Sequence, residues 1–141
     1  MEYILVSACL LGINCKYNGK NNYNEKLVEY LKDKSIIPIC PEIYGGLPTP
    51  RIPSEIKEDR VINKEGVDVT ENFLRGAKET LELAQKFNAK KAILKAKSPS
   101  CGYGLIYDGS FSDKLIEGSG ITAKILEQNG IEILTENDFI K

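Results

Sequence analysis

Four short apolar runs predict β-strands that are buried on both faces. The first run covers residues 3–7 and the second residues 35–40, and two more cover residues 91–96 and 131–134. Continuous stretches of this length, rich in β-branched residues, are typical of the strands of a parallel sheet. The second run contains Pro38, which cannot donate to a sheet ladder. This proline places the second strand at a sheet edge or at a local irregularity.

Between these runs, three stretches repeat their apolar residues at helical spacing. The first begins after Asn24, a candidate N-cap, and the longest covers residues 70–88 with Thr70 as a candidate cap. The third covers residues 120–128 and is followed by Gly130, a typical helix stop. The alternation of strands and helices predicts a three-layer, Rossmann-like α/β domain with a mainly parallel sheet of about four to five strands. We expect residues 1–141 to form a single domain.

Residues 41–60 interrupt this alternation. They contain four of the six prolines and the pair Gly45-Gly46, so we expect a long, stiffened, non-helical loop. Loops of this length inside a compact domain are usually functional or disordered. Apolar residues within this stretch could pack against the rest of the domain, which favours a functional loop over a disordered one.

Composition narrows the classes of function. The chain is 42% hydrophobic and 28% charged, as in ordinary soluble globular proteins. With 19 basic and 20 acidic residues, the net charge of -1 provides no bulk attraction to a nucleic acid polymer or an anionic membrane. No signal peptide and no run of about 18 apolar residues is recognisable, so the expected location is the cytoplasm. The sequence gives no indication of the oligomeric state.

The absence of histidine limits the available chemistry most. It excludes Cys-His nucleophilic pairs and Cys2His2 zinc sites, and it leaves carboxylates, hydroxyls, thiols and lysines as reactive groups. The four cysteines form no CxxC pair, so neither a zinc ribbon nor a thioredoxin motif fits. In a reducing compartment, such widely spaced cysteines are more often metal-binding or catalytic than disulfide-bonded.

Three of the cysteines are expected to meet at one edge of the sheet. Cys9 follows the first strand, Cys40 ends the second, and Cys101 follows the third. Ligands of open α/β sheets bind at the carboxyl ends of the strands, where the loops converge. Any one cysteine could equally be a small buried hydrophobe, but three at the same edge favour a site. We interpret Cys15, in the polar loop after Gly12, as a spare thiol or peripheral redox partner rather than a ligand.

Three thiolates suit a soft metal centre. Zinc would add a fourth protein ligand or a water, whereas a [4Fe-4S] cluster held by three cysteines leaves one iron open to a substrate atom, although four cysteines is the usual count. The spacing of the cysteines alone does not choose between zinc and iron.

Polar residues beside these thiols could carry chemistry. Glu42, two residues after Cys40, is the natural proton donor or acceptor in a site without histidine, or else a solvated loop carboxylate. Ser100, directly before Cys101, could hydrogen-bond a substrate heteroatom or stabilise a turn. Among the cations, Arg51 would recognise an anion or pair with Glu55. We expect Lys95 and Lys97 to face solvent.

Three sequence blocks, in this order, resemble the DUF523 family, which includes the thiouracil desulfidases. The resemblance extends over nearly the whole chain, through residues 118–123. The blocks are Ser7-Ala8-Cys9-Leu10-Leu11-Gly12; Cys40-Pro41-Glu42 with Gly45-Gly46-Leu47-Pro48 and Pro50-Arg51; and Ser98-Pro99-Ser100-Cys101-Gly102 with Ile106-Tyr107-Asp108-Gly109.

The resemblance implies a [4Fe-4S] enzyme that removes sulfur from a small thiolated pyrimidine such as 2-thiouracil, giving uracil and hydrogen sulfide. By motif, Cys9, Cys40 and Cys101 would be the cluster ligands, and the fourth iron would take the substrate sulfur. Glu42 would be the acid/base that assists water attack and protonation, and Ser100 would position or activate the thiocarbonyl.

One position departs from the family pattern. The turn that commonly reads Arg-Tyr-Asp-Gly in the family is Lys16-Tyr17-Asn18-Gly19 here, which bears on substrate preference if that aspartate touches substrate. The main alternative function is a non-catalytic α/β module that binds zinc or a nucleotide. A thiol redox protein using Cys9 and Cys15 is disfavoured by the missing CxxC motif.

Overall fold

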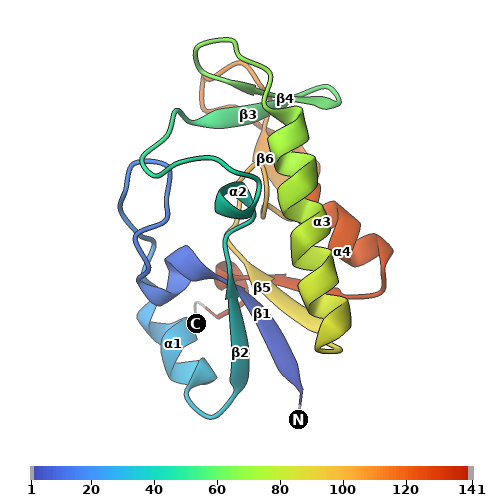
Figure 1. Ribbon diagram of the computed structural model, residues 1–141. Helices are drawn as coiled ribbons and strands as arrows, with labels where there is room; N and C mark the ends of the chain where they lie inside the picture. Colours follow the sequence, from blue (N-terminus) through green and yellow to red (C-terminus); the bar gives the residue numbers. More distant parts are fainter. Residues whose placement is uncertain (1, 140–141) are drawn as a thin grey trace.

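The central element is a four-stranded parallel sheet, seen in a computed structural model that describes residues 2–139 (Figure 1). The strand order is β2-β1-β5-β8, and the four strands pair in parallel throughout. This confirms the α/β class and the mainly parallel sheet expected from the sequence. The strands are β1 (Tyr3–Ser7), β2 (Ser35–Ile39), β5 (Lys91–Leu94) and β8 (Glu132–Thr135).

Helices cover both faces of this sheet (Figure 1). On one face lie α3 (Thr70–Lys86) and α4 (Ile121–Gln128), which share an apolar core with the sheet around Leu5. On the other face lies α1 (Glu25–Leu31), whose Leu27 packs into a second apolar core. The alternation of side chains along β1 explains the two cores, because successive strand residues point to opposite faces. The result is the expected three-layer arrangement.

The edge position predicted for Pro38 is confirmed. β2 is an outer strand of the sheet, and Pro38 lies opposite Val6 of β1. Because β2 has no strand on its outer side, the missing N–H of a proline there can face outward and leave no acceptor of another strand unpaired. The Asn24 cap is also present, since its Oδ1 accepts a hydrogen bond from the Leu27 backbone N–H at 3.0 Å.

Thr70 has a different role from the expected cap. It is the first residue of α3, and Val69 takes the N-cap position. The Thr70 hydroxyl instead accepts a hydrogen bond from the Val61 backbone N–H at 2.8 Å. Asp68 Oδ1 accepts the Thr70 N–H at 2.9 Å, so an aspartate two residues earlier satisfies this helix terminus.

The expectation of a non-helical loop over residues 41–60 is wrong in part. A short helix, α2 (Pro41–Tyr44), begins directly after β2, and β3 (Ser54–Lys57) pairs antiparallel with β4 (Arg60–Asn63). Pro41 explains the helix, because proline at the first helical position has a suitable φ and lacks an N–H that would be unpaired there. The proline content therefore marked a helix start as well as a loop.

Four further elements lie outside the central sheet and the helices that cover it. η1 (Ala8–Leu11) follows β1 as a 3-10 turn, and η2 (Glu136–Phe139) follows β8. β6 (Leu105–Tyr107) and β7 (Leu115–Glu117) form a second antiparallel hairpin. Both hairpins lie beyond the carboxyl ends of the sheet strands (Figure 1). None of the helices that the structure describes is long and apolar enough to cross a membrane.

Candidate active site

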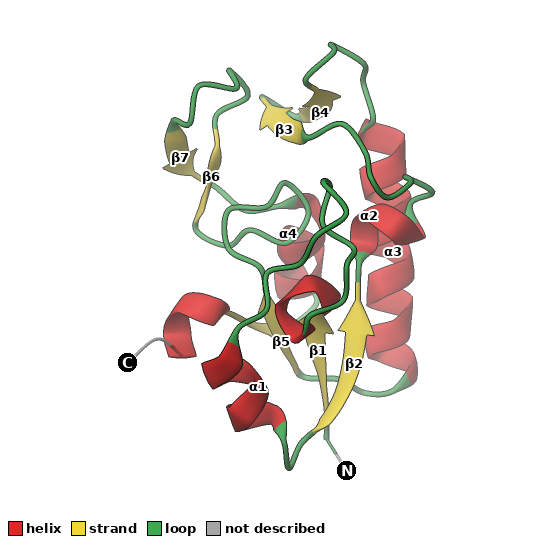
Figure 2. Cartoon of the chain, turned by 90° about the vertical axis from the view of Figure 1, so that its left-hand side faces the viewer, coloured by secondary structure: helices red, strands yellow, loops and turns green. Residues whose placement is uncertain are grey.

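The three cysteines predicted to meet do lie on loops at one edge of the sheet. Cys9 is in η1 directly after β1, Cys40 lies between β2 and α2, and Cys101 is in the loop after β5. Figure 2 shows these loops gathered above the carboxyl ends of the strands. A cavity of about 520 Å³ opens among them. Its lining includes Cys9, Cys15, Cys40, Glu42, Ser100 and Cys101.

The loop that carries Cys101 is held by the Ser98 side chain and by α4. Ser98 Oγ accepts hydrogen bonds from the backbone N–H groups of Ser100 at 3.1 Å and Cys101 at 3.0 Å. The Ser100 carbonyl in turn accepts the N–H of Thr122, in the first turn of α4, at 2.9 Å. Gly120, just before α4, has no room for a side chain, since a Cβ there would lie 2.5 Å from the Ser100 carbonyl carbon and oxygen. The loop is therefore docked rather than loose.

Helix α2 places Cys40 and Glu42. Cys40 is its N-cap residue, and Glu42 lies in its only turn. The helix packs very closely on α3, because a Cβ at Gly76 would lie 1.9 Å from the Pro41 carbonyl oxygen. The close contact therefore requires glycine at this position in the interior of α3, and the contact fixes where α2 lies in the site.

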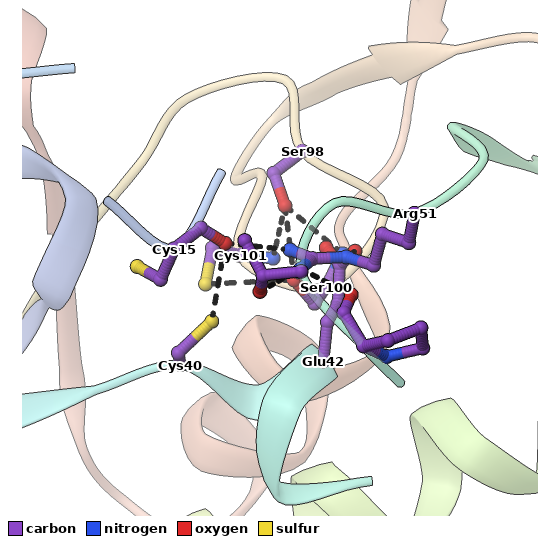
Figure 3. A network of polar contacts seen from close by, with 9 residues as sticks. Cys15, Cys40, Glu42, Arg51, Ser98, Ser100 and Cys101 are labelled. Atoms are coloured by element: carbon purple, nitrogen blue, oxygen red, sulfur yellow. Dashed lines mark hydrogen bonds and ion pairs between the residues drawn. The ribbon is translucent and has the colours of Figure 1, made fainter. Parts of the chain in front are cut away.

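Glu42, Arg51 and Ser100 form a polar network beside the thiols (Figure 3). Arg51 Nε donates to Glu42 Oε1 at 3.0 Å, and the Ser100 hydroxyl donates to the other oxygen, Oε2, at 2.9 Å. The Arg51 and Glu42 side chains are only 7% and 15% exposed. Ser100 Oγ also lies 3.7 Å from Cys101 Sγ. Arg51 therefore pairs with Glu42, and not with Glu55 as one alternative suggested.

Arg51 also connects this network to the segment after η1. Its Nη2 donates to the Cys15 carbonyl at 2.8 Å, and its backbone N–H donates to the Tyr17 carbonyl at 2.7 Å. Because all five N–H donors of arginine are held in a fixed fork, one side chain can orient a carboxylate and a backbone loop together.

Cys15 is closer to the site than the sequence indicated. Hydrogen bonds with the Cys15 thiol are the largest influence on the thiols of Cys9 and Cys40, and they lower the pKa of each to about 7. The same contacts, Cys40 first, raise the pKa of Cys15 itself, because they favour its protonated form. Burial raises the pKa of Cys101 to about 12. The thiols thus divide into two acidic ones and two held protonated in the metal-free protein.

Lys95 was missed as a residue that lines the cavity, and Glu136 was missed as its ion-pair partner. Lys95, expected to face solvent, lines the cavity and pairs with Glu136 at 2.8 Å. Glu136 is buried, and its other oxygen accepts the Ala96 backbone N–H at 2.7 Å. The only sequence signal was position, since Glu136 directly follows the fourth strand and so lies at the same sheet edge.

Asn18 lies outside the cavity lining. Its side-chain oxygen accepts the Lys20 backbone N–H at 3.0 Å within an exposed turn. An aspartate oxygen could accept the same bond, so the departure from the family pattern preserves the turn. The neighbouring residues Lys16 and Tyr17 are the ones that line the cavity.

The donor set fits a cluster better than a single ion. Within residues 2–139, no three Cys, Asp or Glu side chains converge closely enough to hold one metal ion. The cysteines line a cavity of about 520 Å³, and cysteine thiolates are the ligands of iron–sulfur clusters, in which they bind different metal atoms. Sulfur donors select soft metals, iron–sulfur clusters among them. The residues present therefore fit a [4Fe-4S] cluster.

Thiols at the carboxyl edge of an α/β sheet, with a carboxylate–hydroxyl pair beside them, provide groups that can bind a soft metal and transfer a proton. The family model described as 2-thiouracil desulfurase matches residues 4–138, and the chain belongs to this family. This confirms the resemblance to DUF523 seen in the sequence.

Two individual proteins are similar over nearly their whole length. The uncharacterized protein YbbK of Bacillus subtilis (strain 168) is 46% identical, with 96% of each chain covered. The solved structure of a [4Fe-4S]-dependent thiouracil desulfidase, TudS (DUF523Vcz), is 39% identical, with a TM-score of 0.92 over 98% of this chain and 93% of that one. The cofactor of that neighbour agrees with the one expected from the sequence.

Proposed function

We propose that this protein is a desulfidase that removes sulfur, as sulfide, from a small thiolated nucleobase of the 2-thiouracil type. Family membership and the likeness to a [4Fe-4S]-dependent thiouracil desulfidase support the proposal. The reaction is a hydrolysis: water oxygen replaces the thiocarbonyl sulfur, the C–S bond breaks, and hydrogen sulfide leaves. No electrons are gained or lost.

Cys9, Cys40 and Cys101 would hold the [4Fe-4S] cluster through three of its irons. When bound, such a cluster supplies an open iron that acts as a Lewis acid toward the substrate sulfur. The three cysteines come from three different strand ends, so the folded sheet is needed to bring them together. This explains why their spacing in sequence follows no local metal-binding motif.

Glu42 has the geometry of the acid/base. Arg51 holds Oε1, which leaves Oε2 directed toward Ser100 and the Cys101 side of the cavity. From this position Glu42 takes a proton from the attacking water and returns it to the departing sulfur. Ser100 donates its one hydroxyl proton to Oε2, and its oxygen can accept a hydrogen bond from the attacking water; to activate the thiocarbonyl, Ser100 would turn that proton from Glu42 to the substrate sulfur. General acid/base catalysis of this kind contributes about 10²- to 10⁴-fold.

A single observation carries the proposal: the Ser100 hydroxyl lies 2.9 Å from Glu42 and 3.7 Å from the Cys101 sulfur. It joins a proton-transferring carboxylate to a metal-binding thiol inside one cavity. A purely structural metal site does not require a largely buried carboxylate that contacts the neighbour of a proposed ligand.

The test is anaerobic reconstitution followed by iron and acid-labile sulfide analysis, with 2-thiouracil as substrate. We expect about four irons per chain, and sulfide and uracil released in equal amounts. A colourless, iron-free protein after reconstitution would contradict the cluster. Full iron content without sulfide release from any thiolated pyrimidine would contradict the activity and favour a non-catalytic module.

A further inference from the structure

Cys15 is a buried thiol that the proposed three-cysteine ligand set leaves unused. It is 4% exposed and lines the same cavity as Cys9, Cys40 and Cys101. A buried cysteine without a function normally packs among apolar side chains as a small hydrophobe. Cys15 does not, because it belongs to none of the three apolar clusters in the described part of the chain. Its sulfur neighbours are the thiols of Cys9 and Cys40.

The backbone holds Cys15 in this position from several sides. Its N–H donates to the Ile13 carbonyl at 2.8 Å, and its carbonyl accepts from Arg51 Nη2 at 2.8 Å. The Cys40 thiol contacts the same carbonyl at 3.8 Å. Figure 3 shows the sulfur atoms of Cys15 and Cys40 on the same side of the polar network. Cys15 is thus presented to the site by a braced loop.

The number of thiols is the second consideration. Four cysteines is the usual ligand count for a [4Fe-4S] cluster, and a three-cysteine set leaves one iron without a protein ligand. This cavity has four cysteines on its wall. Cys40 directly follows β2, Cys9 lies in η1 and Cys101 lies in the loop docked on α4, whereas Cys15 comes from the irregular segment after η1. Because the hydrogen bonds to its N–H and carbonyl hold the backbone of Cys15 and not its thiol, the sulfur can leave an iron by side-chain rotation while the segment keeps its path.

We propose that Cys15 binds the fourth iron of the cluster while the site has no substrate, and that the thiocarbonyl sulfur displaces it. The proposal rests on the proposed function, because it presupposes the cluster. The exchange is redox-neutral: the Cys15 sulfur–iron bond breaks, the substrate sulfur takes its place, and the released thiolate takes a proton from water. Cys15 would then both protect the open iron from oxidants and compete with substrate.

The experiment compares the anaerobically reconstituted native protein with Cys15→Ala. Both are treated with ferricyanide in small steps, and loss of one iron is followed by iron release and by the near-isotropic EPR signal of a three-iron cluster. Because even indirect partners of metal sites contribute about 10- to 100-fold in affinity, we expect Cys15→Ala to lose the iron at least about tenfold faster. We also expect a lower KM for 2-thiouracil, since the competing ligand is gone.

Two further variants keep the comparison interpretable. Asn21→Ala breaks a contact in the same segment, the 2.9 Å hydrogen bond to Asn14, without touching a thiol, and should lose iron like the native protein. Cys15→Ser keeps the size of the side chain, so it serves as the test if Cys15→Ala fails to fold. It should also lose iron faster, because oxygen is a poorer ligand than sulfur for this metal.

The outcomes separate this proposal from the function. Equal rates of iron loss in the native protein and Cys15→Ala would overturn the proposed role of Cys15. Sulfide release by the native protein would still support the proposed function in that case. Failure of a folded Cys15→Ala to hold any cluster would make Cys15 a permanent ligand and also overturn the exchange. A native protein that assembles no cluster would refute both.

Discussion

Glu42 and Ser100 are 58 positions apart in the chain, yet Glu42 Oε2 lies 2.9 Å from Ser100 Oγ. The contact joins α2, at the end of β2, to the loop after β5, although β1 separates these two strands in the sheet. It bridges the middle of the sheet edge, where η1 presents Cys9. The proposed acid/base pair and the proposed cluster ligands therefore belong to one site.

The first prediction concerns Glu42 itself. Glu42→Gln keeps the shape of the side chain and an oxygen for Arg51, but it cannot transfer a proton. We expect kcat for sulfide release to fall by about 10²- to 10⁴-fold, with unchanged iron content. The measurement is anaerobic sulfide release, normalised to iron per chain. Glu71→Gln, in the first turn of α3, is the control and should behave like the native protein. A Glu42→Gln enzyme with native turnover would remove Glu42 from the mechanism.

The second prediction separates two serines of the same loop. Ser100→Ala removes the hydroxyl that contacts Glu42 and should lower kcat while the cluster stays in place. Ser98→Ala removes the acceptor for the N–H groups of Ser100 and Cys101. Leaving such donors unpaired costs about 1–3 kcal/mol, so Ser98→Ala should lower stability and iron content together. Urea unfolding and iron analysis of both variants distinguish the catalytic role expected of Ser100 from the structural role expected of Ser98. Loss of stability in Ser100→Ala, with loss of kcat alone in Ser98→Ala, would mean that the two roles are assigned the wrong way round.

Much of this site was predictable because parallel α/β topology converts sequence order into spatial neighbours. Cys9, Cys40 and Cys101 could be placed at one edge once three strands were recognised, and Glu42 and Ser100 followed as their sequence neighbours. Pro38 indicated that its strand lies at a sheet edge or at a local irregularity, and the first alternative is the correct one.

What sequence reasoning missed depends on irregular backbone. The path of the segment after η1, which brings Cys15 to Cys9 and Cys40, follows no periodic pattern of apolar residues. The partner of Arg51 was ambiguous for the same reason, since Glu42 and Glu55 lie nine and four positions away and only the fold chooses between them. The prolines of residues 41–60 hid α2, because proline both breaks helices and begins them.

The third prediction is a pH dependence of thiol alkylation in the metal-free protein. The hydrogen bond from Cys15 lowers the pKa of Cys9 and of Cys40 to about 7, whereas burial raises that of Cys101 to about 12. Near neutral pH a larger share of the Cys9 and Cys40 thiols would therefore be thiolate than for an ordinary cysteine. Iodoacetamide should therefore label these two first, with rates that fall as pH drops below about 7.

Mass spectrometry of the labelled peptides measures this directly. Replacing Cys15 by Ala removes the hydrogen bond and should move the labelling of Cys9 and Cys40 to higher pH. If Cys101 is labelled as fast as Cys9 at neutral pH, the Cys101 thiol is not buried as the structure shows.

The fourth prediction uses the close contact between α2 and α3. Gly76 lies inside α3, where alanine normally stabilises a helix by about 1 kcal/mol. Here the added Cβ would lie 1.9 Å from the Pro41 carbonyl oxygen, so α2 must move, carrying Cys40 and Glu42 with it. We expect Gly76→Ala to lose about 1–3 kcal/mol of stability despite its better helix propensity, and to lose iron and turnover as well.

Gly130→Ala is the matched control for this substitution. Its Cβ would meet nothing within 4 Å, but its φ of +82° makes the alanine strained by about 1–2 kcal/mol. It should therefore be destabilised to a similar degree while keeping native iron content and kcat, because the turn before β8 carries no cavity residue. Urea unfolding of the metal-free proteins and iron per chain after reconstitution provide the comparison. Gly76→Ala with native stability and turnover would show that α2 can shift without consequence for the site.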